Sequence, residues 1–118
     1  MAATDFQTAL DNTDEVELTT TGRVTGKQTS RPVWYVRQAG KLYLLPVTGS
    51  DSQWYKNVVK TPAIRLAADD AGYSATATLV TDPGRVAQVV EGFRDKYGAR
   101  DVAAYYPHPD VAVEVPLG

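Results

Sequence analysis

Hydrophobic and polar residues alternate along the first part of the chain, a pattern typical of half-buried β-strands. In Glu15–Thr21 (EVELTTT), Val16 and Leu18 point to one side and the two glutamates to the other. Two further strands are predicted at Arg31–Arg37 (RPVWYVR), which is rich in β-branched and aromatic residues, and at Lys41–Val47 (KLYLLPV). Turns that contain glycine separate the three segments. The pattern therefore predicts a three-strand antiparallel meander.

The spacing then changes to that of a helix in the segment DSQWYKNVVKTP. Asp51 or Ser52 can cap its first turn, and the proline two residues after Lys60 stops it. Because Trp54 and Tyr55 are adjacent, they cannot both face the same way. We expect one of them in the core and the other at a surface or an interface.

The clearest helix begins at Asp82 and Pro83 and is closed by Gly98. Its apolar positions follow the helical period: Val86, Val89, Val90, Phe93 and Tyr97.

The remaining elements are short. We expect a helix at Thr4–Asn12, strands at Ala63–Ala68, Tyr73–Val80 and Val111–Val115, and a turn of helix at Ala99–Tyr106. The predicted fold is mainly β, with about six antiparallel strands and two or three peripheral helices. A sheet of six strands tends to curl and close so that its edges are not left open. We therefore expect a small, partly open β-barrel with helices packed at its mouth.

Composition and charge narrow the classes of function. The chain has 118 residues, 43% of them hydrophobic and 22% charged, which is ordinary for one soluble globular domain over 1–118. It has no cysteine, which removes thiolate catalysis and iron–sulfur clusters from consideration. A net charge of −2 disfavours a nucleic-acid-binding module. We see no secretory signal and no transmembrane segment, so the cytoplasm is the expected location.

The segment Thr19–Pro32 (TTTGRVTGKQTSRP) has two glycines, three cations and several hydroxyl side chains. It is not a nucleotide P-loop, because only three residues separate Gly22 from Gly26 where that motif needs four, Lys27 is followed by Gln28, and a strand comes next. Two interpretations remain. It is either a hairpin tip with solvated charges or a mobile turn whose amides, hydroxyls and cations hold an anionic tail.

The segment Val47–Asn57 (VTGSDSQWYKN) is a second candidate anion site. A flexible Thr-Gly-Ser before a helix N-terminus directs unpaired amides and the positive end of the helix dipole outward. In the alternative interpretation, Asp51 caps the helix, occupies those amides and repels a phosphate.

Other catalytic chemistry finds little support in the sequence. His108 is the one histidine and lies between two prolines, where a surface role is the ordinary explanation. Asp69 and Asp70 lie in an expected turn, so we predict no metal site. There is no nucleophilic serine elbow. An enzyme of this sequence would therefore depend on a cofactor for its chemistry.

Two stretches, TTGRVTGKQTSRPVWYV and KLYLLPVTGSDSQWYKNVVKTPAIRL, resemble the actinobacterial deazaflavin-dependent nitroreductase and quinone reductase family, whose fold is the flavin-binding split β-barrel. The resemblance runs from about Leu18 to Val80. The later segment Phe93–Gly98 (FRDKYG) also resembles a related group of uncharacterised bacterial split-barrel domains that have no established cofactor.

The family resemblance implies a homodimer that binds coenzyme F-420, a 5-deazaflavin, and passes hydride to a quinone, a nitro compound or a similar conjugated acceptor. FMN or no cofactor remains as an alternative. The implied cofactor-binding residues are Arg23, Thr25, Gly26, Lys27 and Arg31 for the phosphate and acidic tail, Val47, Thr48, Gly49 and Ser50 beside the ring, and Trp54, Tyr55, Lys56 and Asn57 in the helix that closes the groove. Tyr105 and Tyr106 fall near the substrate-facing tyrosines of the family and are the candidate catalytic residues.

The sequence departs from the family at two positions in the basic turn. Val24 stands where the family usually has a second basic residue, and the cation expected near Thr29 is displaced to Arg31. One missing charge-assisted contact weakens binding by about tenfold to a hundredfold. The alternative function is therefore a non-enzymatic split barrel that binds a lipid, a different flavin or no cofactor.

Overall fold

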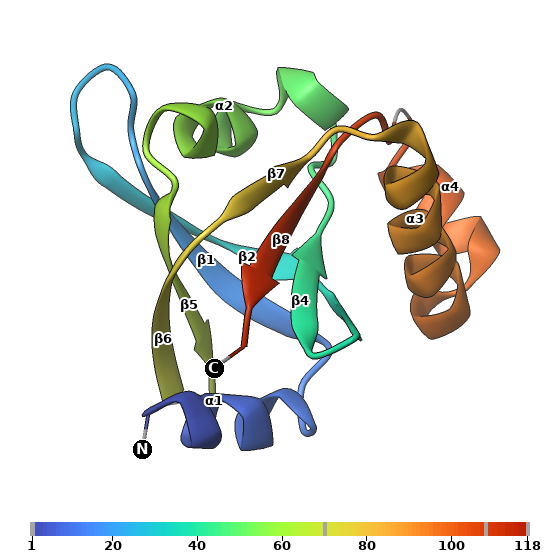
Figure 1. The fold of residues 1–118 in the computed structure, drawn as a ribbon, viewed down its shortest axis with the longest axis horizontal. Coiled ribbons are helices and arrows are strands. Elements are labelled where there is room, and N and C mark those ends of the chain that lie inside the picture. Colours follow the sequence, from blue (N-terminus) through green and yellow to red (C-terminus); the bar gives the residue numbers. More distant parts are fainter. Residues whose placement is uncertain (1, 70, 108, 118) are drawn as a thin grey trace.

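The strands form two four-stranded antiparallel sheets with the main hydrophobic core between them (Figure 1). The structure, a computed structural model, describes residues 2–69, 71–107 and 109–117. In the first sheet, β1 (Glu15–Thr21) lies between β2 (Gln28–Trp34) and β5 (Ala63–Ala68), and β6 (Ala71–Thr76) pairs with β5. The buried side of β1 is the apolar side predicted from its alternation.

The second sheet has the order β3 (Val36–Gln38), β4 (Lys41–Leu44), β8 (Ala112–Pro116) and β7 (Thr78–Val80). The strand predicted at Lys41–Val47 ends early. Residue 46 is a proline, which cannot donate to the ladder.

Two strands predicted as continuous are each divided between the two sheets. The predicted strand Arg31–Arg37 is broken at Tyr35, and Tyr73–Val80 is broken at Ala77. At Ala77 the N–H donates to the carbonyl of Pro62 at 2.8 Å. Each chain segment turns a corner from one sheet into the other, and alternation cannot reveal this because both halves have the composition of a strand.

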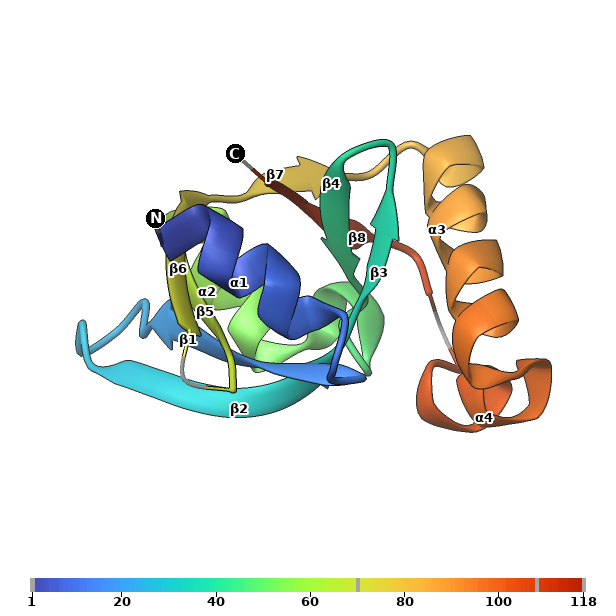
Figure 2. The same cartoon turned by 90° about the horizontal axis from the view of Figure 1, so that it is seen from below.

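Helices close the two ends of the space between the sheets. α1 (Ala2–Leu10) lies across one end, and the 3₁₀ turn η1 (Gly49–Asp51) leads into α2 (Gln53–Lys60) at the other (Figure 1). α3 (Pro83–Tyr97) and α4 (Ala99–Tyr105) lie outside, beside the second sheet (Figure 2). They form a second hydrophobic cluster with one face of that sheet.

The predicted fold class, mainly β with peripheral helices, is confirmed. The described residues contain eight strands and four α-helices instead of about six strands and two or three helices, and the two sheets do not form a closed barrel. The predicted bounds of β1 and β5 are correct. The predicted helix at Thr4–Asn12 begins earlier and ends earlier, as α1. Asp70, in the predicted turn before β6, lies outside the described residues.

Candidate functional site

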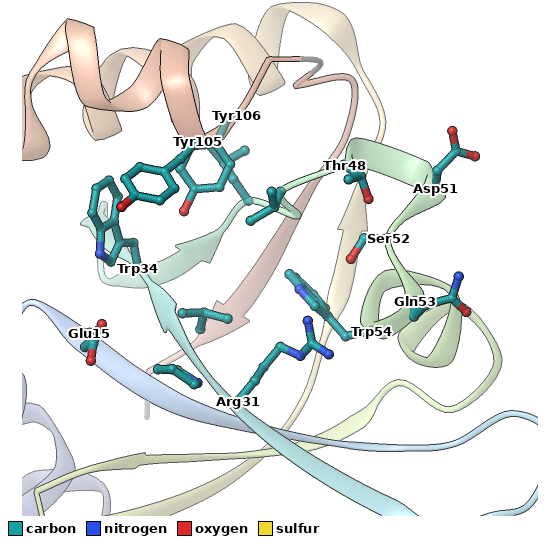
Figure 3. Close-up of a pocket in the computed structure, with 14 residues that line it drawn as sticks. Glu15, Arg31, Trp34, Thr48, Asp51, Ser52, Gln53, Trp54, Tyr105 and Tyr106 are labelled. Carbon is teal, nitrogen blue, oxygen red and sulfur yellow. The ribbon is translucent and has the colours of Figure 1, made fainter.

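A hollow of about 600 Å³ opens between the end of β2, the segment that leads into α2, and the end of α4 (Figure 3). Trp34, Tyr105 and Tyr106 lie on one side of it, and Trp54 and Arg31 lie on the other. The rest of its lining is formed by Glu15, Pro32, Val33, Leu45, Val47, Thr48, Asp51, Ser52 and Gln53. This hollow is one of two adjacent hollows that together form a groove, and we call it the aromatic part of the groove.

A second hollow of about 320 Å³ lies between the turn after β1 and the face of α2. It is lined by Gly22, Arg23, Val24, Thr25, Thr29, Arg31, Gln53, Trp54 and Asn57. We call it the basic part of the groove, because these lining residues, all of them described by the structure, include two arginines and no Asp or Glu. Arg31, Gln53 and Trp54 line both hollows, so the two parts are adjacent.

The strand register explains how Arg31 reaches the groove. Leu18 of β1 pairs with Arg31 on one side and with Leu66 on the other. Cross-strand partners point to the same face of a sheet, so Arg31 leaves β2 on the side of the core although it is exposed. Its guanidinium points toward Trp54 (Figure 3). Within the described part of the chain it has no hydrogen bond or ion pair, which leaves its charge available to a ligand.

Arg23 is held on α2 by neutral acceptors. Its guanidinium donates to Asn57 Oδ1 at 2.8 Å and to Gln53 Oε1 at 2.6 Å, and its backbone N–H also donates to Asn57 Oδ1, at 3.2 Å. Lys60 Nζ donates to the carbonyl of Arg23 at 2.7 Å. No carboxylate among the described residues pairs with this guanidinium. The arginine is therefore fixed in place while its positive charge stays uncompensated.

The basic turn uses its own amides. The N–H of Gly22 donates to the carbonyl of Lys27 at 2.8 Å, and the N–H of Gly26 donates to the carbonyl of Gly22 at 2.9 Å. The N–H of Lys27 donates to Thr25 Oγ1 at 3.2 Å. At Gly26 the backbone angle φ is 73°, a conformation that is favourable for glycine and unfavourable for residues with a side chain. The amides of Gly22, Gly26 and Lys27 are therefore occupied and are not available to an anion.

The backbone N–H groups of residues 49–52 are occupied as well. Three of them donate to carbonyl groups of the same turn at 3.0–3.3 Å. The fourth, that of Ser50, donates to Asp110 Oδ1 at 2.9 Å, and the Ser50 hydroxyl donates to Asp110 Oδ2 at 2.6 Å. For residues 49–52 the expectation of unpaired amides is therefore wrong, because the turn pairs three of them and a distant segment supplies a carboxylate for the fourth.

The helix cap also differs in detail from the prediction. Ser52 occupies the N-cap position of α2, but its side chain makes no capping hydrogen bond. Asp51 belongs to η1 and lines the aromatic part of the groove. Asp51 is therefore not the cap, and the carboxylate that accepts from an amide of this segment, that of Ser50, belongs to Asp110.

Trp54 and Tyr55 are both buried, at 3% and 5% exposure. The expectation that one of them faces a surface or an interface is wrong. Both belong to the main hydrophobic core, since α2 covers one end of the space between the two sheets. Burial raises the pKa of the Tyr55 hydroxyl, and the nearby charge of Asp110 raises it further.

The aromatic part of the groove is built from rings that meet edge to face. The ring of Trp34 lies 4.9 Å from that of Tyr105 and 6.2 Å from that of Tyr106, at interplanar angles of 65° and 60°. Tyr105 is 55% exposed and Tyr106 is buried. Burial raises the pKa of Tyr106 above the ordinary tyrosine value, which adds to the preference for the neutral hydroxyl that any tyrosine has at neutral pH.

The structure brings most of the residues implied by the family resemblance to the groove. Its lining includes Arg23, Thr25, Arg31, Val47, Thr48, Trp54, Asn57, Tyr105 and Tyr106. The others line neither part: Gly26, Lys27, Gly49, Ser50, Tyr55 and Lys56.

Sequence reasoning missed Trp34 and Gln53. Gln53 lies one helical turn before Asn57, and this i, i+4 spacing is a signal that it shares a face with a candidate residue. Trp34 has no such signal, because it is the corner at Tyr35 that directs the end of β2 toward α4.

His108 lies outside the described residues. The residues that are described contain no group of three or more His, Asp or Glu side chains that could hold a metal ion. Nor do they include a helix with both the length and the apolar character needed to cross a bilayer.

Residues 7–112 match the family described as "Uncharacterized protein conserved in bacteria (DUF2255)". The chain belongs to this family. No curated protein matches the chain.

Solved structures with similar folds include proteins of different function. An F420-H2 dependent reductase is 22% identical, with a TM-score of 0.66 over 86% of this chain and 93% of that one. A structure described as a domain-swapped dimer is 22% identical, with a TM-score of 0.65 over 86% and 79%. HutZ, the heme storage protein of Vibrio cholerae, is 12% identical, with a TM-score of 0.75 over 98% and 89%. The split-barrel resemblance predicted from the sequence is thus confirmed at the level of the fold.

Proposed function

We propose that the groove binds a deazaflavin coenzyme and that the protein is a reductase, which passes hydride from the reduced coenzyme to a quinone, a nitro compound or another conjugated acceptor. One observation carries the proposal. A hollow with two arginines and no acid joins a hollow with aromatic walls, and Arg31 and Trp54 belong to both. A ligand that carries an anionic tail on a planar ring system has this division of charge and shape.

The residues of the basic part fit the anionic tail of such a coenzyme. Arg23 is fixed by neutral acceptors and Arg31 has no described partner, so both guanidinium groups keep their charge for a phosphate. The hydroxyl side chains of Thr25 and Thr29 line the same hollow. Lys27, in contrast, lines neither part of the groove, so the proposal gives the leading role to the two arginines.

The residues of the aromatic part would orient the ring and exclude water. Trp54 is buried at the junction of the two parts, and Val47 and Thr48 line the hollow beside it. The deazaflavin supplies the hydride when it is bound. At the far wall, the protonated hydroxyl of Tyr106 can donate a hydrogen bond to an oxygen of the acceptor, and the exposed Tyr105 flanks the opening.

A fluorescence titration with oxidised deazaflavin coenzyme, run in parallel with FMN, tests this proposal. Saturable micromolar binding of the deazaflavin alone supports it and directs the next experiment to a screen of acceptors with the reduced coenzyme. Binding of FMN alone would transfer the proposal to a flavin enzyme. Binding of neither would contradict it.

A second candidate function is a non-enzymatic split barrel that binds a lipid, another flavin or nothing. It is favoured by Val24, which is 88% exposed at a position where the deazaflavin family usually has a cation. Native mass spectrometry of freshly purified protein separates the two functions. A copurified lipid or flavin would give a defined mass shift, which the reductase proposal does not require.

The homodimer and the cytoplasmic location belong to the same proposal. The dimer is supported by the family resemblance and by the similar structure described as a domain-swapped dimer. Size-exclusion chromatography with light scattering measures the mass in solution. A monomer at all concentrations would show that the groove of one chain has to bind its ligand alone.

A further inference from the structure

The segment Phe93–Gly98 ends α3 and supports the aromatic wall of the groove from behind. The ring of Tyr97 stacks on Trp34 at 4.2 Å between centroids and 9° between planes. The ring of Phe93 meets Tyr106 edge to face at 5.5 Å and 76°. Neither Phe93 nor Tyr97 lines the groove itself. The two residues therefore touch side chains of the groove wall without touching the space for a ligand.

The hydroxyl of Tyr97 holds the chain corner next to Trp34. It accepts the backbone N–H of Tyr35 at 3.1 Å, and it lies 2.7 Å from the carbonyl oxygen of Tyr35 and 2.6 Å from that of Asp14. One hydroxyl has one proton, so it donates to one of these carbonyls at a time. Tyr35 belongs to neither β2 nor β3. At this corner, Tyr97 thus replaces the hydrogen bonds that a sheet partner would supply.

Lys96 adds to the same attachment. Its Nζ donates to the carbonyl of Tyr35 at 3.0 Å and lies 3.4 Å from the centroid of the Tyr35 ring. The hydroxyl of Tyr35 in turn lies 2.5 Å from the carbonyl oxygen of Leu10 and 2.7 Å from that of Thr13, and it donates to one of them at a time. The last turn of α3 therefore holds both backbone groups of Tyr35 and one face of Trp34.

We propose that Tyr97 is a positioning residue, which fixes the indole of Trp34 as a preformed wall of the groove and so increases the affinity of the groove for its ligand. A wall that is ordered before binding removes the cost of ordering that side chain when the ligand arrives. The inference deepens the proposed function and depends on it for the choice of ligand. Its structural part, the fixed Trp34, is measurable without any ligand.

The test compares Tyr97→Leu, which removes the stacked ring and the hydroxyl, with Tyr97→Phe, which keeps the ring. Tyr73→Leu is the matched control, because Tyr73 also stacks on an aromatic ring, that of Phe6, at 5.2 Å and 9°, and its hydroxyl also donates to a backbone carbonyl. Tyr73 lines neither part of the groove. Thermal unfolding of all three variants shows how much stability each one loses.

Two quantities are measured. The first is acrylamide quenching of Trp34 in a Trp54→Phe background, in which Trp34 is the single tryptophan. The second is the Kd for oxidised deazaflavin in the native background. We expect Tyr97→Leu to increase the quenching constant clearly and to weaken binding about tenfold, while Tyr97→Phe stays within about threefold of the wild type. Tyr73→Leu should lower Tm without changing quenching or Kd.

Equal quenching in Tyr97→Leu and Tyr73→Leu would overturn the inference, since Trp34 would then be fixed without Tyr97. Increased quenching with an unchanged Kd would also overturn it, because the wall would not matter for binding. If the wild type binds no deazaflavin, the proposed function fails. The quenching comparison then decides by itself whether Tyr97 fixes Trp34.

Discussion

Asp110 accepts hydrogen bonds from both polar groups of Ser50, at 2.9 Å from the N–H and 2.6 Å from the hydroxyl, across a separation of 60 residues in the chain. A carboxylate with two donors in this arrangement takes the position that a bound anion would take at the same turn. The turn beside the aromatic part of the groove therefore already holds an anion of the protein's own. This favours the basic part, at the other end, as the place for the charged tail of a ligand.

Replacing Asp110 with Ala should open the turn to small anions. We expect the variant to lose about 1 kcal/mol of unfolding free energy, or about 4 °C in Tm, because two hydrogen bonds disappear. Phosphate should then restore part of that loss by binding to the donors of Ser50. Differential scanning fluorimetry in increasing phosphate at constant ionic strength measures both effects.

Asp51→Ala is the control for this experiment. Asp51 is a neighbouring exposed carboxylate whose side chain has no hydrogen bond or ion pair within the described residues. Its removal changes the net charge by the same amount as the removal of Asp110, but it breaks no such contact. If phosphate stabilised Asp51→Ala as strongly as Asp110→Ala, the effect would come from net charge, and the interpretation of the turn as an occupied anion site would be wrong.

Arg31→Ala should weaken deazaflavin binding about tenfold or more, which corresponds to one lost charge-assisted contact. The stability of the fold should change little, because Arg31 is exposed and has no described partner. Lys27→Ala should have a much smaller effect on binding, since Lys27 lines neither part of the groove. Isothermal titration calorimetry at one ionic strength compares the variants.

Arg65→Ala provides the matched control for Arg31→Ala. Arg65 is exposed and has no described partner, but it pairs in register with Thr19, next to Leu18, and so leaves the first sheet on the opposite face. Equal losses of affinity in Arg31→Ala and Arg65→Ala would show that binding follows net charge, which would contradict a site at Arg31.

Gln53→Glu should weaken the binding of deazaflavin without lowering the stability of the fold. Arg23 donates to Gln53 Oε1 at 2.6 Å, and a carboxylate of the same shape would neutralise that guanidinium. We expect stability to stay equal or to rise by a few tenths of a kcal/mol, since the new charge lies at the N-terminus of α2. Deazaflavin affinity should fall about tenfold because the anion loses an uncompensated cation.

The control for the added charge is Gln28→Glu. Gln28 is exposed and belongs to a hollow on the far face of the first sheet. Thermal unfolding and calorimetry are measured on both variants. An unchanged affinity in Gln53→Glu would contradict a binding role for the charge of Arg23.

The strands of the fold were predictable where the signal is local. The predicted bounds of β1 and β5 are correct, and each strand keeps one buried face along its whole length with a less buried face opposite. The corners at Tyr35 and Ala77 were not predictable, since both sides of each corner have strand-forming residues. A change of sheet depends on long-range partners, such as the hydroxyl of Tyr97 at Tyr35, and these leave no periodic pattern.

The residues of the candidate site were likewise predictable where the signal is local, and not where they depend on a distant segment of the chain. The family motif identified Arg23, Arg31 and Trp54, whose positions follow from a turn, a strand and a helix that are local in sequence. It could not identify the contact between Ser50 and Asp110, which joins segments that are distant in the chain. A motif lists residue types in order, whereas the free or occupied state of an amide is decided by whatever segment packs against it.

The last prediction concerns Glu114, which is 7% exposed on β8. Its carboxylate accepts from Arg85 at 2.7 Å and from the hydroxyl of Tyr43 at 2.8 Å. The hydrogen bond from Arg85 lowers the pKa of Glu114 below its ordinary value, against the opposing effect of burial, and the contacts with Tyr43 and Lys41 lower it further. Because the pKa is lower in the folded state, this contribution to stability is present above about pH 4.3, the ordinary glutamate pKa, and is lost as the pH falls through the folded pKa.

Glu114→Gln should therefore cost about 2 kcal/mol of unfolding free energy at pH 7, and the difference from wild type should shrink as the pH falls from 7 to about 3. Urea unfolding at a series of pH values measures this difference. Glu91→Gln, which removes a surface ion pair with Arg94, should change stability by less than about 1 kcal/mol at pH 7. A gap between Glu114→Gln and wild type that stayed constant down to pH 3 would show that Glu114 contributes through shape and packing instead of through its charge.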